Sequence, residues 1–123
     1  MNKIIPSESK EQCIVFEWAN LNIWKYPQLV YLHHIPNGRK RTKVEAAILQ
    51  REGVKPGVPD LFLPIAKKNY HGLYIEMKRV KGSAVSDLQQ KWIDMLRKEG
   101  YCVEVCYGAS MAIEVIENYL EEV

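Results

Sequence analysis

Residues 57–82 read GVPDLFLPIAKKNYHGLYIEMKRVKG, and the expected fold is built outward from this segment. Its two apolar runs, residues 60–65 and 73–80, are rich in aliphatic and aromatic residues and are separated by lysines, Asn69 and a His-Gly pair. Apolar runs on either side of a polar turn predict a β-hairpin. We therefore expect an antiparallel strand pair in the middle of the chain.

The second run carries two charges in apolar surroundings, Glu76 and Lys78. Side chains two residues apart on a strand project from the same face, so these two charges point together while Met77 points away. Burying an ion is costly unless it is paired or bound to a metal. Taken alone, the pair is therefore either a salt bridge at an exposed edge or part of a site.

The hairpin register brings a second carboxylate to the first. Opposed residues of an antiparallel pair have a constant index sum, and a turn centred on Lys68 sets Asp60 opposite Glu76. Directly opposed Cβ atoms are about 4.5–5.5 Å apart. Carboxylates that close repel each other unless something positive lies between them. The register thus favours a divalent cation between them, with the amine of Lys78 beside it.

Outside the hairpin, the pattern predicts four helices and two further strands. The helices are expected from Ser7 or Ser9 to Pro27 and over residues 44–52, 86–99 and about 110–120, and the strands over 29–35 and 101–107. In the third helix, Ser86 and Gln89 have capping-box spacing, and Leu88, Trp92, Met95 and Leu96 form the expected buried face. The order predicts one α/β domain over residues 1–123, with a mixed central sheet of about four strands flanked by helices.

Charge is distributed unevenly along a chain whose net charge is only +2. Residues 37–81 hold eleven Lys and Arg against four Asp and Glu, whereas the last twenty residues hold five acids and no base. Such a basic segment is either a solvated loop or the contact surface of an anionic partner. No apolar run approaches the roughly 20 residues of a membrane span, and three cysteines do not form a disulfide framework. We expect a cytoplasmic protein.

These residues resemble a known nuclease family. Pro59-Asp60, followed after fifteen residues by Glu76-Met77-Lys78, resembles the PD-(D/E)XK signature, and the wider chain resembles its VRR-NUC branch (virus-type replication-repair nucleases). Ser86-Asp87 departs from the family, where many members carry Ser-Pro. The resembling stretches are Ser7-Glu8 with Gln12, Trp18-Ala19, Ile35 to Gly38, Glu52 to Val54, Gly57 to Leu61, His71-Gly72, Glu76 to Lys78, Lys81-Gly82, Ser86 with Gln89, Gly100-Tyr101 and Ile116 to Leu120.

The resemblance implies a restriction-endonuclease-like core with a site for Mg²⁺ or Mn²⁺. Its expected metal ligands are Glu8, Asp60, Glu76 and the Met77 carbonyl, and its expected catalytic residues are Asp60, Glu76, Lys78 and Gln89. Lys78 would act on the attacking water or on the transition state, and Gln89 would support the site or contact a phosphate. Glu11 and Glu17 lie on the same helix as Glu8 and are alternatives to it.

The resemblance also gives the basic segment a substrate. Arg39, Lys40, Arg41, Lys43 and Lys81 would contact DNA phosphates, which provides affinity without sequence readout. Stand-alone members resemble archaeal Holliday-junction resolvases, so the implied activity is cleavage of four-way junctions by a homodimer, in a bacterial or phage-infected cell. A junction has two symmetric cleavage positions, which a two-fold dimer matches.

Three other functions compete with this one. The scaffold is compatible with a flap-specific, exonucleolytic or restriction-type nuclease, or with a DNA-binding module that does not cut. An HNH-type nuclease would use His33, His34 and Asn37, but it needs a histidine or asparagine on the following helix, and residues 44–52 contain none.

Overall fold

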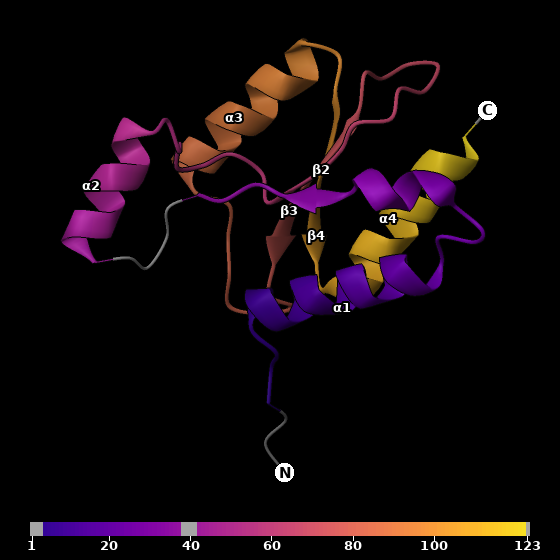
Figure 1. The fold of residues 1–123 in the computed structure, drawn as a ribbon, viewed down its shortest axis with the longest axis horizontal. Helices are drawn as coiled ribbons and strands as arrows, with labels where there is room; N and C mark the ends of the chain where they lie inside the picture. The colour runs from indigo at the N-terminus through magenta and orange to yellow at the C-terminus, as the bar shows by residue number, and fades with distance from the viewer. Residues whose placement is uncertain (1–3, 38–41, 123) are drawn as a thin grey trace.

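The chain is described by a computed structural model over residues 4–37 and 42–122. The elements follow the predicted order, with one added 3₁₀ helix (Figure 1). They are α1 (Glu8–Leu21), η1 (Pro27–Tyr31), β1 (His33–His34), α2 (Lys43–Arg51), β2 (Leu61–Leu63), β3 (Leu73–Lys78), α3 (Asp87–Lys98), β4 (Cys102–Tyr107) and α4 (Ala109–Glu121).

The four strands form one mixed sheet in the order β1-β2-β3-β4. β1 and β2 are antiparallel, β2 and β3 are antiparallel, and β4 runs parallel to β3 after the α3 crossover. Leu61 pairs with Ile75 and Leu63 with Leu73, which is the predicted hairpin register. The mixed α/β fold and the hairpin are therefore confirmed.

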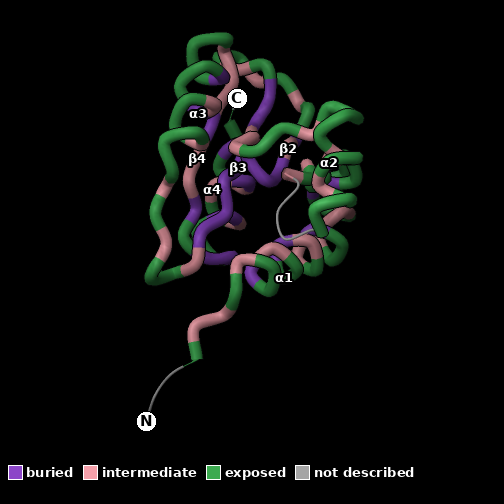
Figure 2. Tube along the Cα trace, turned by 90° about the vertical axis from the view of Figure 1, so that its left-hand side faces the viewer, coloured by how far each residue is buried: buried purple, intermediate pink, exposed green. Residues whose placement is uncertain are grey.

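Helices cover the sheet unequally on its two faces. α1 and α4 pack against each other and against β3 on one face, and α3 packs against β4 on the other. Figure 2 shows the strands buried at the centre. The larger core includes Val15, Ala19, Leu61, Leu63, Leu73, Ile75, Met77, Ala112 and Ile116, and the smaller core under α3 is built on Ile93, Leu96 and Val103.

Three local expectations are wrong. The first helix ends at Leu21, with Asn22 as its C-cap, rather than at Pro27. Residues 29–35 do not form a strand: η1 takes their first part, and only His33–His34 pair with β2. Pro27, at the start of η1, has its φ fixed near the helical value, and Leu29 is the residue of η1 that is buried. In α3, Leu88 and Met95 are exposed, whereas Ile93 is buried. Ile93 is buried because it lies on the side of α3 that packs against β4.

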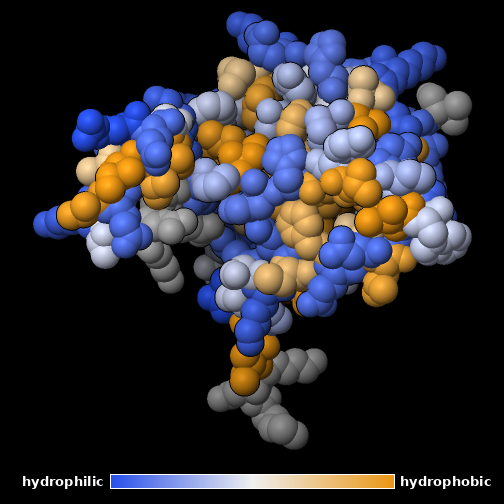
Figure 3. All heavy atoms as spheres, in the orientation of Figure 1, coloured by the Kyte–Doolittle hydropathy of each residue, from blue (hydrophilic) through white to orange (hydrophobic). Residues whose placement is uncertain are grey.

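α2 lies apart from the sheet. None of its residues is buried, and Val44 and Ile48 are exposed. Figure 3 shows hydrophobic side chains on this helix at the left of the view. A hollow of about 260 Å³ separates it from the body of the protein and is lined by Asn37, Ala46, Leu49, Gln50, Val54 and Pro56. None of the helices in residues 4–37 and 42–122 is long and apolar enough to cross a membrane.

The capping residues of two helices follow from the sequence. Ser7, rather than Ser9, is the N-cap of α1, and its Oγ accepts a hydrogen bond from Lys10 N at 3.1 Å. Ser86 and Gln89 form the predicted capping box of α3, in which each side chain accepts from the backbone N–H of the other. The beginning of α3 is therefore held by two reciprocal hydrogen bonds.

We expect Ser86→Ala to lower the free energy of unfolding by about 1 kcal/mol, because the substitution removes one half of the capping box. Urea denaturation measures the change. Ser110→Ala is the matched control, since Ser110 is an exposed serine near the start of α4, and it should shift the value by less than about 0.5 kcal/mol. Equal losses in both variants would contradict a stabilising role for the Ser86 cap.

Candidate active site

Two buried charges lie at the end of the central strand β3. Glu76 is 1% exposed and Lys78 is 4% exposed. Both project toward the α3 face of the sheet, while Ile75 and Met77 belong to the larger core on the other face. β3 is hydrogen-bonded to strands on both sides. An exposed-edge salt bridge is therefore the wrong interpretation of this pair.

Asp60 lies directly before β2, opposite Glu76 when the observed register is continued by one residue. It is 2% exposed, and its Oδ2 accepts a hydrogen bond from Met77 N at 2.8 Å. The Asp60 carbonyl accepts from Ile35 N at 2.7 Å and from His34 Nδ1 at 2.9 Å. Asp60 is thus tethered through its backbone on the β1 side and through its carboxylate to β3.

One amide joins the carboxylate, the ammonium and the helix cap. Gln89 Oε1 accepts hydrogen bonds from Lys78 Nζ and from Ser86 N, both at 2.9 Å. Its Nε2 donates to Glu76 Oε2 at 3.3 Å. Lys78 Nζ is 3.9 Å from the same Glu76 oxygen. The capping box therefore orients the Gln89 amide, and the amide in turn holds both charged groups.

The Glu76 carboxyl lies in surroundings that favour its neutral form, although Lys78 is nearby. Burial, followed by the neighbouring Asp60 carboxylate, raises the pKa of Glu76 to about 9. Lys78 opposes this rise, and Glu8 adds to it. Glu76 Oε1 is also buried without a hydrogen-bond partner among the described residues. Without a further positive charge, this carboxyl is therefore protonated at neutral pH.

The helix α1 presents three acids in three different surroundings. Glu8 acts electrostatically on Glu76, and its Oε1 accepts a hydrogen bond from Ser83 Oγ at 3.1 Å. Glu11 is buried against the start of α4, where a Cβ on Gly108 would come within 2.9 Å of its Oε2. Glu17 is exposed. Sequence reasoning missed Ser83, because a loop residue carries no periodic signal.

The basic residues are placed only in part. Lys43, the first residue of α2, is exposed, and so is Lys81 in the loop between β3 and α3. Arg39, Lys40 and Arg41 lie outside the described residues. Lys81 follows Lys78 by three residues and is therefore close to the site along the chain.

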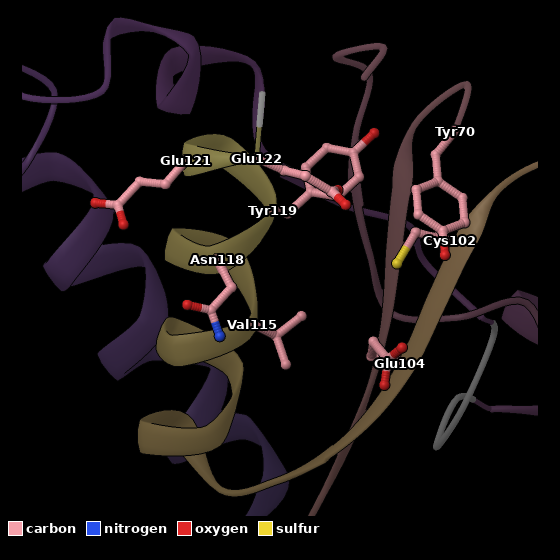
Figure 4. A pocket seen from close by; sticks show the side chains of 8 residues that line it. All are labelled: Tyr70, Cys102, Glu104, Val115, Asn118, Tyr119, Glu121 and Glu122. Atoms are coloured by element: carbon pink, nitrogen blue, oxygen red, sulfur yellow. The ribbon is translucent and has the colours of Figure 1, made fainter. Parts of the chain in front are cut away.

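A small hollow lies beside the buried cluster, and a larger one lies elsewhere. The small one, about 200 Å³, is lined by Asn37, Pro56, Gly57, Ser86, Leu88 and Gln89. The larger one, about 470 Å³, lies between β4 and α4 and is lined by Tyr70, Cys102, Glu104, Val115, Asn118, Tyr119, Glu121 and Glu122 (Figure 4). Burial, followed by the charge of Glu104, raises the pKa of Cys102 to about 11, so this thiol is not a nucleophile. The charged cluster beside Gln89 is therefore the better candidate for chemistry.

Comparison with known proteins agrees with this geometry. The family model of the VRR-NUC domain matches residues 4–110. The chain belongs to the VRR-NUC domain family. A solved structure described as a VRR_NUC domain protein is 38% identical in sequence, with a TM-score of 0.81 over 96% of this chain and 91% of that chain. No curated protein matches the chain.

A VRR-NUC domain is a nuclease domain of the PD-(D/E)XK type, so the chain carries a nuclease fold that acts on nucleic acid. The residues that resemble the motif of that type, Asp60 and Glu76-Met77-Lys78, are gathered at the end of β3. In this chain the two halves of the motif are joined by a hydrogen bond, which the backbone N–H of Met77 donates to Asp60 Oδ2.

PD-(D/E)XK nuclease domains generally use divalent metal ions, and the donors at the end of β3 fit such an ion. Glu76 Oε1 has no hydrogen-bond partner within residues 4–37 and 42–122, and the Met77 carbonyl faces the same side as the Met77 N–H that meets Asp60. Carboxylate and carbonyl oxygens suit a hard cation. Within the described ranges no three Asp, Glu, His or Cys side chains form a metal-holding group. The structure therefore brings Asp60 and Glu76 together, with Glu8 nearby but not at the same point.

The stability of the metal-free protein should depend on pH through Glu76. Its folded pKa is about 9 against an ordinary value of 4.5, so the folded protein retains a proton that the unfolded chain releases. This contribution is fully present below pH 4.5 and is lost as the pH rises toward 9. Thermal melts in EDTA should therefore show a Tm that falls with rising pH, and Glu76→Gln should flatten that slope.

Glu114→Gln, at an exposed position on α4, is the matched control and should keep the wild-type slope. If Glu76→Gln and wild type have the same pH slope, the Glu76 carboxyl is ionised in the metal-free protein.

Proposed function

We propose that this VRR-NUC protein is a metal-dependent, structure-selective DNA endonuclease that hydrolyses phosphodiester bonds in four-way junctions as a homodimer. The observation that carries the proposal is the buried convergence of Asp60, Glu76 and Lys78 at the end of β3, where Gln89 holds Glu76 and Lys78 and the Met77 N–H holds Asp60. Maintaining two carboxylates and an ammonium inside a sheet costs free energy, which a purely structural strand would avoid.

In the proposed site, Asp60, Glu76 and the Met77 carbonyl hold Mg²⁺ or Mn²⁺, and Glu8 completes the set from α1. When bound, the ion supplies a nucleophile by lowering the pKa of water and stabilises negative charge as a Lewis acid. Asp60 is already oriented by Met77 N, and Ser83 orients Glu8. These residues thus reach the metal from three separate segments of the chain.

Lys78 provides a fixed positive charge next to the carboxylates. Its Nζ donates to Gln89 Oε1, so the ammonium does not depend on Glu76 alone for its position. In the proposed reaction this ammonium orients the attacking water and stabilises the extra negative charge of the transition state. Preorganised charge of this kind acts at the transition state more than in the bound substrate.

DNA would be held by phosphate contacts rather than by base readout. Lys43, the first residue of α2, and Lys81, in the loop between β3 and α3, are exposed, and Arg39, Lys40 and Arg41 belong to the same basic stretch of sequence. The sequence contains no zinc-finger or basic-zipper pattern. Selection by the shape of a branched substrate is therefore the proposed source of specificity, and a two-fold dimer would match the two symmetric strands of a junction.

We expect Lys78→Ala to bind a four-way junction with an affinity close to that of wild type but to cleave it at least about a hundredfold more slowly, because the lost charge acts in the transition state. Single-turnover cleavage and anisotropy measure the two quantities separately. Lys98→Ala removes an exposed lysine at the far end of α3 and should retain wild-type cleavage. Unchanged turnover in Lys78→Ala would refute the proposed role.

A substrate panel tests the activity and its selectivity. Purified protein is incubated with a four-way junction, a flap and a linear duplex, each with Mg²⁺, with Mn²⁺ and with EDTA. The proposal expects cleavage of the junction in both metal arms, with little cleavage of the other substrates and none in EDTA. Equal cleavage of all three DNAs would support the nuclease activity but contradict the selectivity for junctions. Binding without any cleavage would identify a non-catalytic DNA-binding module.

A further inference from the structure

Aromatic side chains occupy the row of the sheet next to the proposed metal ligands. In the strand register His33 pairs with Phe62, and Phe62 pairs with Tyr74. We call these three residues the aromatic row. Tyr74 and Glu76 are two residues apart on β3 and so share one face. Two residues of strand span about 7 Å, so the aromatic row lies about that distance from the Asp60–Glu76 pair.

The rings of the aromatic row form a continuous surface. Phe62 and Tyr74 stack with centroids 4.2 Å apart and planes 22° apart, and His33 meets Phe62 edge-on at 5.8 Å. Tyr101 contacts Tyr74 at 5.3 Å and Phe62 at 6.1 Å. Offset-stacked and edge-to-face pairs are the favoured arrangements of aromatic rings. The row is therefore held in a defined position before any ligand arrives.

Gly72 makes room for this arrangement. A Cβ at this position would lie 2.8 Å from Phe62 Cε1 and 3.2 Å from the Leu63 carbonyl oxygen. The first contact is with a ring that is itself stacked on Tyr74, and the second is with backbone. The Phe62 ring therefore lies over the strand at Gly72, along the sheet.

The row is only partly covered. His33 is exposed, and Phe62 and Tyr74 are half-buried. In the described ranges α3 packs against β4, and no helix packs closely against β1 or β2 on this face. On the other face, by contrast, Leu61 and Leu63 of β2 are fully buried in the larger core. The face that holds the charged cluster thus leaves the three side chains of the aromatic row partly accessible, His33 most of all, while Tyr74 and Tyr101 also pack against the smaller core under α3.

Because the aromatic row adjoins the Asp60–Glu76 pair on one face of the sheet, we infer that it stacks an unpaired base of the DNA substrate. This base would lie next to the phosphodiester that Asp60 and Glu76 engage. The inference rests on the proposed nuclease function and adds a source for its structure selectivity. A DNA strand whose phosphate reaches the carboxylates passes about 7 Å from the rings, the spacing of two residues along a β-strand. Every base has a flat face, so stacking accepts any sequence but requires a base freed from its pair, as at a branch point.

The test compares binding of two DNAs in EDTA, where cleavage does not interfere. One is a duplex with a splayed end of unpaired nucleotides, and the other is the same duplex fully paired. Phe62→Leu and His33→Ala should each weaken binding of the splayed duplex about tenfold, the size of one lost base–aromatic stack, and leave the paired duplex unchanged. Trp24→Leu removes an exposed aromatic residue outside the aromatic row and is the matched control.

Salt dependence separates stacking from phosphate contact. The aromatic variants should retain the wild-type slope of log K against log salt, because a ring neutralises no phosphate, whereas Lys81→Ala should reduce the slope by about one. His33 is exposed, so His33→Ala decides the question even where Phe62→Leu unfolds. An unchanged preference for the splayed duplex in His33→Ala and in folded Phe62→Leu overturns the inference.

The outcome is independent of catalysis. If the protein cleaves no DNA but the preference for the splayed duplex is lost in the aromatic variants, the stacking surface stands and the proposed nuclease function fails. If metal-dependent cleavage is observed and the aromatic variants bind both duplexes like wild type, the nuclease stands and the stacking surface is refuted.

Discussion

The arrangement of the site is set by one unfavourable contact, the approach of two buried carboxyl groups, Asp60 and Glu76, across the β2–β3 hairpin. Asp60 and Glu76 are each almost inaccessible to solvent, and their mutual repulsion together with burial raises the pKa of Glu76 to about 9. The surroundings compensate in specific ways: Met77 N donates to Asp60, and the Gln89 amide links Glu76 to Lys78. Glu76 Oε1 has no hydrogen-bond partner in the part of the chain that the structure describes. The carboxyl and carbonyl oxygens gathered here suit a divalent cation, which nucleases of this type generally use.

The beginning of α3 connects helix stability to the site. In a capping box the residue at N3 normally serves only the backbone. Here the same Gln89 oxygen that accepts from Ser86 N also accepts from Lys78 Nζ. A change that loosens the first turn of α3 would therefore also release the ammonium. α1 and α4 close the larger apolar core on one face of the sheet, whereas the other face carries the smaller core under α3 together with the charged cluster and the aromatic row.

Membership of the VRR-NUC family and the local geometry support the same chemistry from separate directions. The family match covers residues 4–110 as a whole, while the site is built from atoms at the end of β3. The aromatic row of His33, Phe62 and Tyr74 lies on the same face as the charges. In the proposal, the charged cluster would engage a phosphate and the rings would stack a base, a combination suited to DNA whose strands have separated. The proposed selectivity for branched substrates then needs no separate recognition domain.

The sequence by itself determined the hairpin register, the Ser86–Gln89 cap and the pairing of Asp60 with Glu76, because each follows from spacing along a few residues of chain. Tertiary structure alone decided the rest. Glu8, Glu11 and Glu17 cannot be distinguished by the sequence pattern. In the structure Glu8 acts on Glu76, Glu11 is buried beside the start of α4, and Glu17 is exposed to solvent. The same holds for η1 in place of a strand and for the buried face of α3. Local patterns do not specify which neighbour an element meets, and that neighbour sets the burial and the charge of each side chain.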